Sequence, residues 1–343
     1  MSSRPTIADI AARADVSVAT VDRVLNGRHR VREETARKVY DAARVIGYHA
    51  AGLIRQRIER DLPVVRLGFL LLKEDQAFYR SFAAALTRAV EETPGVRGIA
   101  QIEYVKTQTP PDFVAGLDLL AGKSQAIAVA SLDHHLVTRA VEGLKARGVP
   151  VFSLLSDCAQ GVRESYVGLN NIKVGRTAAW LISRTAPKPG TVAVFVGSHR
   201  WHGHELRETG FRSFFREHAP HFRVLDTLVN LDTKEVTHEA TLSLVERHPD
   251  LAGFYVAGGG FEGAITALRE LRLDNPPSVI VNELVPETIA ALYDHLIVGA
   301  IATPLDRLCR SLVDMMVQSL RNGPAEKPGQ VFLPFSLHVP ESL

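Results

Sequence analysis

Polar and aromatic side chains follow apolar runs in the central and C-terminal parts of the sequence. Arg207 lies in the string LRETG, and Phe78 and Tyr79 come shortly after an apolar run. A polyhydroxylated ligand needs donors and acceptors, which amides, carboxylates and a guanidinium supply. The candidate ligand-binding residues are Asp75, Phe78, Tyr79, Asp133, Asn170, Asn171, Trp201, Arg207, Asn282 and Glu283. Surface or helix-capping duty is an open alternative for several of them, including Asp133 and Asn171.

A second group of side chains, near the N-terminus, has the types that read DNA bases. Ser17, Val18, Ala19 and Thr20 are all small, and Arg23 comes one helical turn later. Small side chains let a helix approach base edges, apolar ones can contact a thymine methyl, and arginine can donate to guanine. A plain three-helix bundle is the alternative, but a small outer face followed by arginine does little for solubility alone.

Three short helices are expected to carry this group. Apolar residues recur at helical spacing over 6–14, 17–25 and 33–46, with Thr6 and Ser17 as N-caps. Two short helices across a tight turn, braced by a third, form a helix-turn-helix. The basic loop Arg28-His29-Arg30 comes after the second helix, where it could hold phosphates.

Charge and composition fit a DNA-binding arm on a neutral body. The chain has 343 residues and a net charge of +2, but residues 1–62 carry 12 Lys and Arg against 8 Asp and Glu. That arm is therefore +4 and the remainder is −2, an asymmetry that suggests contact with nucleic acid. Two cysteines exclude a disulfide scaffold and a Cys-rich zinc protein. We expect no membrane span and no secretory signal, and so a cytoplasmic protein.

The N-terminal segment closely resembles the lac repressor (LacI/GalR) family. The resemblance rests on TIADIAARADVSVATVDRVLNG over residues 6–27, VREETARKV over 31–39, and Gly47-Tyr48. It implies that Val18, Ala19 and Arg23 read bases and that Asn26 and Arg30 make loop contacts. It also implies a homodimer, with a tetramer possible, on palindromic double-stranded operator DNA.

The chain departs from the family pattern in two places, and there the roles of family residues are least applicable to this chain. Asp22 stands where serine is usual, so its carboxylate would repel phosphate or accept a bond from cytosine N4. In the hinge, Ala50 and Ala51 replace Pro-Asn, and the position of the leucine that wedges into the minor groove falls on Arg57. Either Leu53 or Ile58 supplies the wedge after a register change, or Arg57 enters the groove by its charge. The candidate DNA-binding residues are Thr6, Ser17, Val18, Ala19, Thr20, Asp22, Arg23, Asn26, Arg30, Leu53 and Arg57.

From about residue 64 the chain alternates expected strands and helices, which predicts a doubly wound α/β architecture. The fold class expected is an N-terminal three-helix helix-turn-helix headpiece plus hinge, then two parallel α/β lobes of the type I periplasmic-binding-protein kind. The expected domains are 1–48 (DNA-binding), 49–63 (hinge) and 64–343 (effector-binding and dimerisation). Within the last, lobe one covers about 64–186 and 302–330, and lobe two covers about 190–300 and 331–343. A single last strand is expected over 331–338.

The same resemblance gives the ligand-binding candidates their roles. Asn170-Asn171 match a pair that precedes a glycine, here Gly175, and Arg207 matches a sugar-hydroxyl-binding arginine. The resemblance implies a ligand-responsive, sequence-specific transcriptional regulator, a repressor of a carbohydrate, cyclitol or sugar-acid catabolic operon. Its effector is expected to be small, polar and sugar-like, with no cofactor and no membrane partner.

Other motifs leave weaker alternatives. Residues 258–263 read GGGFEG, which contains G-x-G-x-x-G, with Glu283 twenty residues beyond; that formally matches a dinucleotide fingerprint. Three histidines within 199–204 suggest a metal, although a loop lining a cleft explains them better. No G-x-S-x-G or H-E-x-x-H occurs, so we expect no enzyme. A solute-binding protein without an export signal, and less so a dinucleotide-dependent enzyme, remain the alternatives.

Overall fold

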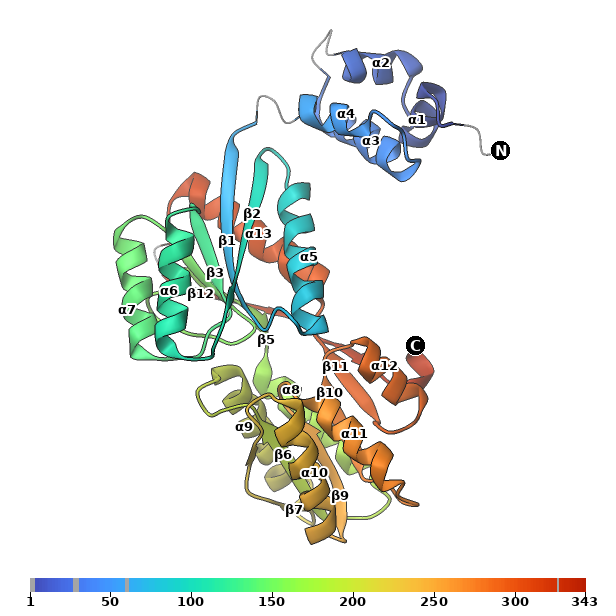
Figure 1. The fold of residues 1–343 in the computed structure, drawn as a ribbon, viewed down its shortest axis with the longest axis vertical. Coiled ribbons are helices and arrows are strands. Elements are labelled where there is room, and N and C mark those ends of the chain that lie inside the picture. The colour runs from blue at the N-terminus through green and yellow to red at the C-terminus, as the bar shows by residue number, and fades with distance from the viewer. Residues whose placement is uncertain (1–3, 27–30, 59–61, 326) are drawn as a thin grey trace. The chain divides into compact units, whose positions relative to one another are not determined.

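The computed structural model describes residues 4–26, 31–58, 62–325 and 327–343. The chain divides into two compact units, one formed by 1–65 with 93–98 and the other by 66–92 with 99–343. The N-terminal unit carries four helices, and the other unit is built on two sheets (Figure 1).

The N-terminal helices pack around a small apolar core. The helices are α1 (Ile7–Ala14), α2 (Val18–Asn26), α3 (Glu33–Val45) and α4 (Ala51–Ile58). Ile10, Val21, Val39 and Ile54 are fully buried, one from each helix. The three predicted helices are confirmed, and the predicted Thr6 cap forms a capping box with Asp9. The fourth helix lies where a hinge was expected and contributes Ile54 to the same core.

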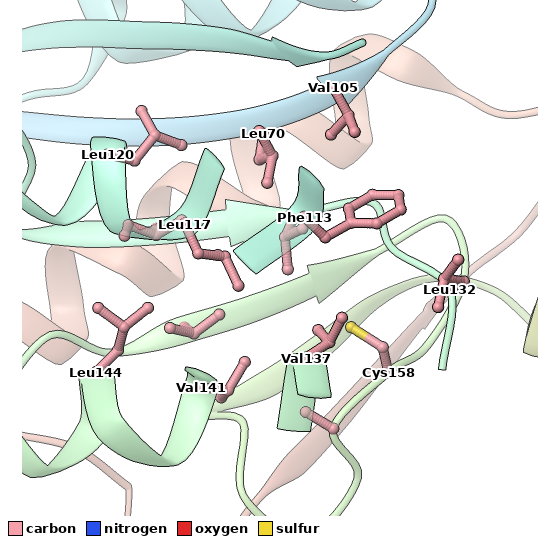
Figure 2. Close-up of a cluster of buried hydrophobic side chains, with 14 of the residues drawn as sticks. Leu70, Val105, Phe113, Leu117, Leu120, Leu132, Val137, Val141, Leu144 and Cys158 are labelled. Carbon is pink, nitrogen blue, oxygen red and sulfur yellow. The ribbon is translucent and has the colours of Figure 1, made fainter. Parts of the chain in front are cut away.

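The first lobe is a six-stranded sheet in the order β12-β5-β4-β3-β1-β2. Its strands are β1 (Val64–Leu72), β2 (Arg97–Val105), β3 (Ala126–Val129), β4 (Val151–Leu154), β5 (Ser165–Leu169) and β12 (Gly329–Leu333). Its helices are α5 (Ala77–Glu92), α6 (Pro110–Ala121), α7 (His135–Ala146) and α13 (Leu305–Asn322). Helices α6 and α7 cover one face and α5 and α13 the other (Figure 1). Figure 2 shows the core between the sheet and α6 and α7.

The second lobe is a seven-stranded sheet in the order β13-β11-β10-β9-β6-β7, with β8 also paired to β6. Its strands are β6 (Thr191–Val196), β7 (Arg223–Val224), β8 (Leu228–Val229), β9 (Leu251–Val256), β10 (Ser278–Asn282), β11 (Gly299–Ala302) and β13 (Ser336–His338). Its helices are α8 (Asn171–Thr185), α9 (His202–His218), α10 (Lys234–Arg247), α11 (Phe261–Leu271) and α12 (Pro286–Tyr293), and the short helix η1 (Pro340–Ser342) ends the chain.

The two sheets repeat one winding, which confirms the predicted doubly wound fold. In each sheet the first strand lies inside: β2 and β3 flank β1 in the first sheet, and β7 and β9 flank β6 in the second, where β8 also pairs with β6. The strand order reverses at this point, and ligands of such sheets bind at the carboxyl ends of the strands beside it. Those ends carry Lys73 after β1 and Gly197 after β6.

The predicted single strand over 331–338 is wrong. Strand β12 pairs with β5 in the first sheet, whereas β13 pairs antiparallel with β11 in the second. The chain therefore crosses between lobes after Leu333, and Pro334, which has no amide hydrogen for a ladder, lies at the break. The expected lobe limit at residues 330 and 331 consequently divides β12.

Two other strand predictions also change. Strand β5 was not expected, because its string SYVGL is short and contains a glycine that weakens the strand signal. Gly168 is needed there, since a Cβ atom would lie 2.2 Å from the Tyr166 hydroxyl oxygen. The alternation of strands and helices predicts one strand over 223–229, but the structure has two short strands there, β7 and β8, both paired to β6. No helix among the described residues is long and apolar enough to span a bilayer.

Candidate functional site

The outer face of α2 is small and accessible. Val18 is 52% exposed, and Ala19 and Arg23 are exposed beside it. The hydroxyl groups of Ser17 and Thr20 lie 2.8 Å apart, and Ser17 also accepts from the Thr20 amide. These two hydroxyls therefore serve the start of the helix, which leaves the apolar pair and the arginine as its outward groups.

Asp22 is engaged along the helix. The Asn26 side-chain amide donates to Asp22 Oδ1 at 2.7 Å, one turn apart, and both residues are exposed. The carboxylate is thus drawn toward the C-terminal end of α2 and retains its second oxygen for another donor. This bond joins Asn26, for which the family resemblance implies a loop contact, to Asp22, which departs from the family pattern.

The remaining headpiece candidates lie in different places. Thr6 is exposed and caps α1. Leu53 is 57% exposed on α4, next to the buried Ile54. Arg57 belongs to the last turn of α4, and its side chain lies outside the described residues, as does the whole of Arg30.

A cavity lies between the carboxyl ends of the two sheets of the larger unit. Six of the predicted residues line it: Phe78, Tyr79, Trp201, Arg207, Asn282 and Glu283. Polar residues that sequence reasoning did not select also line it: Lys73, Gln76, Gln108, Ser156, His204 and Asp232. Lys73 directly follows β1 and His204 belongs to the histidine-rich segment, so a sequence feature could have identified each of them. Asp232 follows the short strand β8 and had none.

Arg207 is held rigidly by neighbouring groups. Its Nε donates to Asn171 Oδ1 at 2.7 Å, and its Nη1 donates to the Ala257 carbonyl at 2.7 Å. Close packing of α8 on α9 sets its position, because a Cβ at Gly175 would lie 1.9 Å from the Arg207 carbonyl oxygen. Asn171 therefore positions the arginine rather than lining the cavity. The buried guanidinium can donate to a ligand without searching for its orientation.

The Asp232 carboxylate occupies a cradle of glycines. A Cβ at Gly197 would come within 2.1 Å of its Oδ2 and one at Gly258 within 2.5 Å of its Oδ1. The Gly259 amide donates to Oδ1 at 2.8 Å. Of the glycines in the G-x-G-x-x-G string, Gly258 thus makes room for a carboxylate of the chain itself, whereas Gly260 and Gly263 face the Thr237 hydroxyl and the Lys234 carbonyl. A pyrophosphate placed there would meet that negative charge, which removes the physical basis of the dinucleotide reading.

His204 is a neutral donor at the same wall. Its Nδ1 accepts from the Gly197 amide at 3.2 Å, so the proton of the neutral ring is on Nε2. Burial, with the nearby cations Arg207 and Lys73, lowers its pKa to about 4, although Asp232 opposes the shift. Donor and acceptor groups therefore stand side by side on the second lobe.

Four residues around the cavity have left-handed backbone conformations, which side chains other than glycine seldom adopt. The φ angles are 42° at Lys73, 61° at Leu155, 52° at Asp232 and 66° at Glu283. Lys73, Leu155 and Glu283 each directly follow a strand, β1, β4 or β10. Backbone strain of this kind collects at binding sites, where the fold holds a side chain in a required direction.

Glu283 and Asn282 form a braced wall of the cavity. The Glu283 carboxylate accepts from the Thr303 amide at 2.9 Å and from its hydroxyl at 2.7 Å. Burial raises the pKa of Glu283, while these two bonds and Arg207 oppose the shift. Asn282 accepts from the Tyr255 hydroxyl and donates to the Ala257 carbonyl, each at 2.9 Å. The other charged groups that line the cavity are Asp232, Lys73 and Arg207.

Besides Asn171, three predicted residues lie away from the cavity lining. Asp75 is exposed on the loop before α5. Asp133 is exposed and accepts from the Ala159 amide at 3.3 Å. Asn170 is the N-cap of α8 and accepts from the Lys173 amide at 3.0 Å. Capping, the alternative weighed for such residues, accounts for Asn170.

The histidines of 199–204 do not converge on one point. His199 lies 3.9 Å from Glu208 and His202 lies 3.6 Å from Glu205, while His204 faces the cavity. Within the ranges that the structure describes, no group of three or more His, Cys, Asp or Glu side chains suits a metal ion. The loop interpretation of this segment therefore explains His204 better than a metal does.

The fold and these two sites define a class of protein: a helix-turn-helix headpiece followed by a two-lobed domain with a ligand-sized cavity. Residues 6–50 match the family described as "Bacterial regulatory proteins, lacI family", and residues 67–324 match "Periplasmic binding protein domain". The chain belongs to the lacI family of bacterial regulatory proteins, and its larger part is a periplasmic binding protein domain.

Relatives with this organisation match nearly the whole chain. The HTH-type transcriptional regulator MalR of Streptomyces coelicolor is 26% identical over 342 residues, covering 96% of this chain and 94% of the relative. The sucrose operon repressor of Streptococcus mutans is 24% identical, covering 98% and 99%. The crystal structure of GanP, a glucose-galactose binding protein of Geobacillus stearothermophilus, has a TM-score of 0.72 at 19% identity. It covers 81% of this chain and 99% of its own, which shows the fold of the two lobes.

Proposed function

We propose that this transcriptional regulator represses a carbohydrate, cyclitol or sugar-acid catabolic operon and releases or binds its operator in response to a small polar effector. The observation that carries the proposal is the presence, on one chain, of an accessible α2 face and of a cavity lined by aromatic and polar groups. The name of the sucrose operon repressor, a relative over nearly its full length, supports the sugar class.

Each of the three domains has its own role in this proposal. Residues 1–48 bind DNA, 49–63 form the hinge, and 64–343 bind effector and dimerise in the cytoplasm. Val18 and Ala19 contact apolar groups in the major groove, while Arg23 donates to a guanine. A homodimer would present two α2 helices to the two halves of a palindromic operator.

The effector is held from both lobes. Lys73 and Gln108 act from the first lobe, and Arg207, Asp232 and His204 act from the second. These groups offer both donors and an acceptor, which suits adjacent hydroxyls. Phe78 and Tyr79 cover an apolar face of the ring. We propose no catalytic step and no cofactor.

Selection from a random double-stranded DNA library with the full-length protein tests the DNA half of this proposal. The expected result is a palindromic sequence whose affinity falls steeply with salt, because lysines and arginines displace counterions. Binding without any enriched sequence would overturn it. A thermal-shift panel of sugars, cyclitols and sugar acids tests the effector half, and Arg207→Met serves as the variant that should lose the shift.

A further inference from the structure

The segment 198–204 of the second lobe is seated in the first lobe. It lies between β6 and the first turn of α9, so it belongs to the second lobe by chain connection. Trp201 is nevertheless only 5% exposed and packs among the buried side chains of the first lobe. Its ring centroid lies 6.3 Å from that of Phe113 in an edge-to-face arrangement. Trp201 thus fills the apolar core of the opposite lobe.

Backbone hydrogen bonds hold this segment on both sides of the tryptophan. The Asp133 amide donates to the Arg200 carbonyl at 3.0 Å, and the Gly203 amide donates to the Ser156 hydroxyl at 3.1 Å. Each bond joins one lobe to the other. Figure 2 shows Phe113, Leu132, Val137 and Cys158 of the receiving core gathered toward one end of the cluster.

The first lobe makes the reciprocal contact. Phe78, at the start of α5, packs against the buried cluster of the second lobe. The Lys73 ammonium, just before it, donates to the Asp232 carbonyl at 2.6 Å. Each lobe therefore inserts an aromatic side chain against the core of the other, and each insertion lies next to an interlobe hydrogen bond.

We propose that the 198–204 segment is a latch that holds the two lobes together through contacts of the chain itself. Its central contact is the packing of Trp201 in the core of the first lobe. Opening the cleft would withdraw an indole from an apolar core and break two hydrogen bonds, one between backbone groups and one from a backbone amide to the Ser156 hydroxyl, and both changes cost free energy. Trp201, Gly203 and His204 also line the cavity, so a molecule exchanges with the cavity only when the latch is open. This last step rests on the proposed role of the cavity, whereas the latch itself does not.

The latch sets an order of events that differs from simple closure around a ligand. Ligand contacts add to an interlobe attraction that the chain already has, so an effector shifts the closed population only by its differential affinity. Weakening the latch should therefore speed ligand exchange and raise the share of open molecules. Trp201 is a positioning residue in this scheme, since it affects ligand exchange by holding the two lobes together.

Hydrogen exchange of the full-length protein, with no ligand added, tests the latch. Trp201→Ala should accelerate exchange of the Asp133 and Gly203 amides severalfold, because both bonds cross between lobes. Amides inside β6, such as that of Val194, should keep their rates. The matched control is Trp180→Ala, since Trp180 is 46% exposed on α8 and should leave every rate unchanged. Unchanged rates at both amides in Trp201→Ala would overturn the proposal.

A second measurement keeps the test independent of how Trp201→Ala folds. The chain has two tryptophans, so Trp180→Phe leaves Trp201 as the sole emitter. Its emission should be blue-shifted and weakly quenched by acrylamide, and Ser156→Ala in the same background should increase the quenching. Strong quenching in the single-tryptophan protein, with native circular dichroism, would contradict the latch. If both measurements support the latch but no compound in the thermal-shift panel binds, the result would count against the proposed effector role alone.

Discussion

At the residue scale, the two sites differ in how their side chains are placed, because one helix carries the DNA-facing group whereas distant segments build the cavity. The α2 face was predictable because one short helix carries it, and local spacing decides which residues share a face. Arg207 was also predictable, but its orientation was not, since Asn171 and the Ala257 carbonyl come from distant segments. Asp232 was not predicted, because the glycines that leave room for its carboxylate are distant in the sequence. Gly197, for example, lies 35 residues before it.

Arg23 should carry base recognition. Arg23→Ala should cost about 1–3 kcal/mol of specific operator affinity and relax the preference at one base pair. Arg23→Lys is the matched control, because it keeps the charge for phosphate but loses the planar fork that guanine needs. Competition binding against the selected sequence and its single-base variants measures both. An unchanged preference in Arg23→Ala would contradict the assignment.

His204 should make the protein sensitive to acid. Its pKa is about 4 in the folded state, against the usual histidine value of 6.5, so the folded state binds fewer protons than the unfolded chain between these two values. The stability linked to this residue is therefore full above pH 6.5 and falls as pH drops toward 4, by about 3 kcal/mol at most.

Thermal unfolding between pH 7 and pH 4 measures this loss. His204→Gln should flatten the dependence over that window, while the exposed His221→Gln should not. Equal slopes in the wild type and His204→Gln would contradict the neutral, buried state of the ring.

At the scale of elements, glycines decide how closely helices approach. The sequence predicted most helices of the lobes because apolar periodicity marks them, but it could not show which pairs touch. Helices α8 and α9 meet at Gly175 and Gly210, where each helix lies against a backbone carbonyl of the other. The strand errors have the same origin, since β5, β7 and β8 are short and depend on partners elsewhere in the chain.

Gly175→Ala should push α8 away from α9 and displace Arg207. A Cβ there would clash with backbone at 1.9 Å, and backbone cannot rotate aside as a side chain can. We expect a loss of about 1–3 kcal/mol in unfolding free energy, with weaker effector binding. Gly143→Ala on α7 is the matched control, because open space surrounds that position, and it should be neutral or stabilising by about 1 kcal/mol. Equal stability of the two variants in denaturant titrations would contradict this packing.

At the scale of the whole molecule, one chain carries a DNA-reading face and a ligand cavity in two separate compact units. Their number and order were predictable, because the headpiece motif and the alternation of strands and helices extend over long stretches of sequence. The interlobe contacts around the cavity were not predictable, because they join residues that lie far apart in the sequence, as Lys73 and Asp232 do. In the N-terminal unit, Ile54 of α4 packs in the headpiece core, so part of the segment expected to be a hinge belongs to the packed structure of that unit.

Occupancy of the cavity should change the affinity of the protein for operator DNA. The measurement that tests it is the operator affinity of the full-length protein with and without a compound that raises its melting temperature. We predict a change of at least fivefold, equal to the change that operator causes in affinity for the compound, since such coupling is reciprocal (about 1 kcal/mol or more). Arg207→Met should abolish the change while still binding operator. A compound that binds in the cavity of the wild-type protein yet leaves operator affinity unchanged would contradict the account.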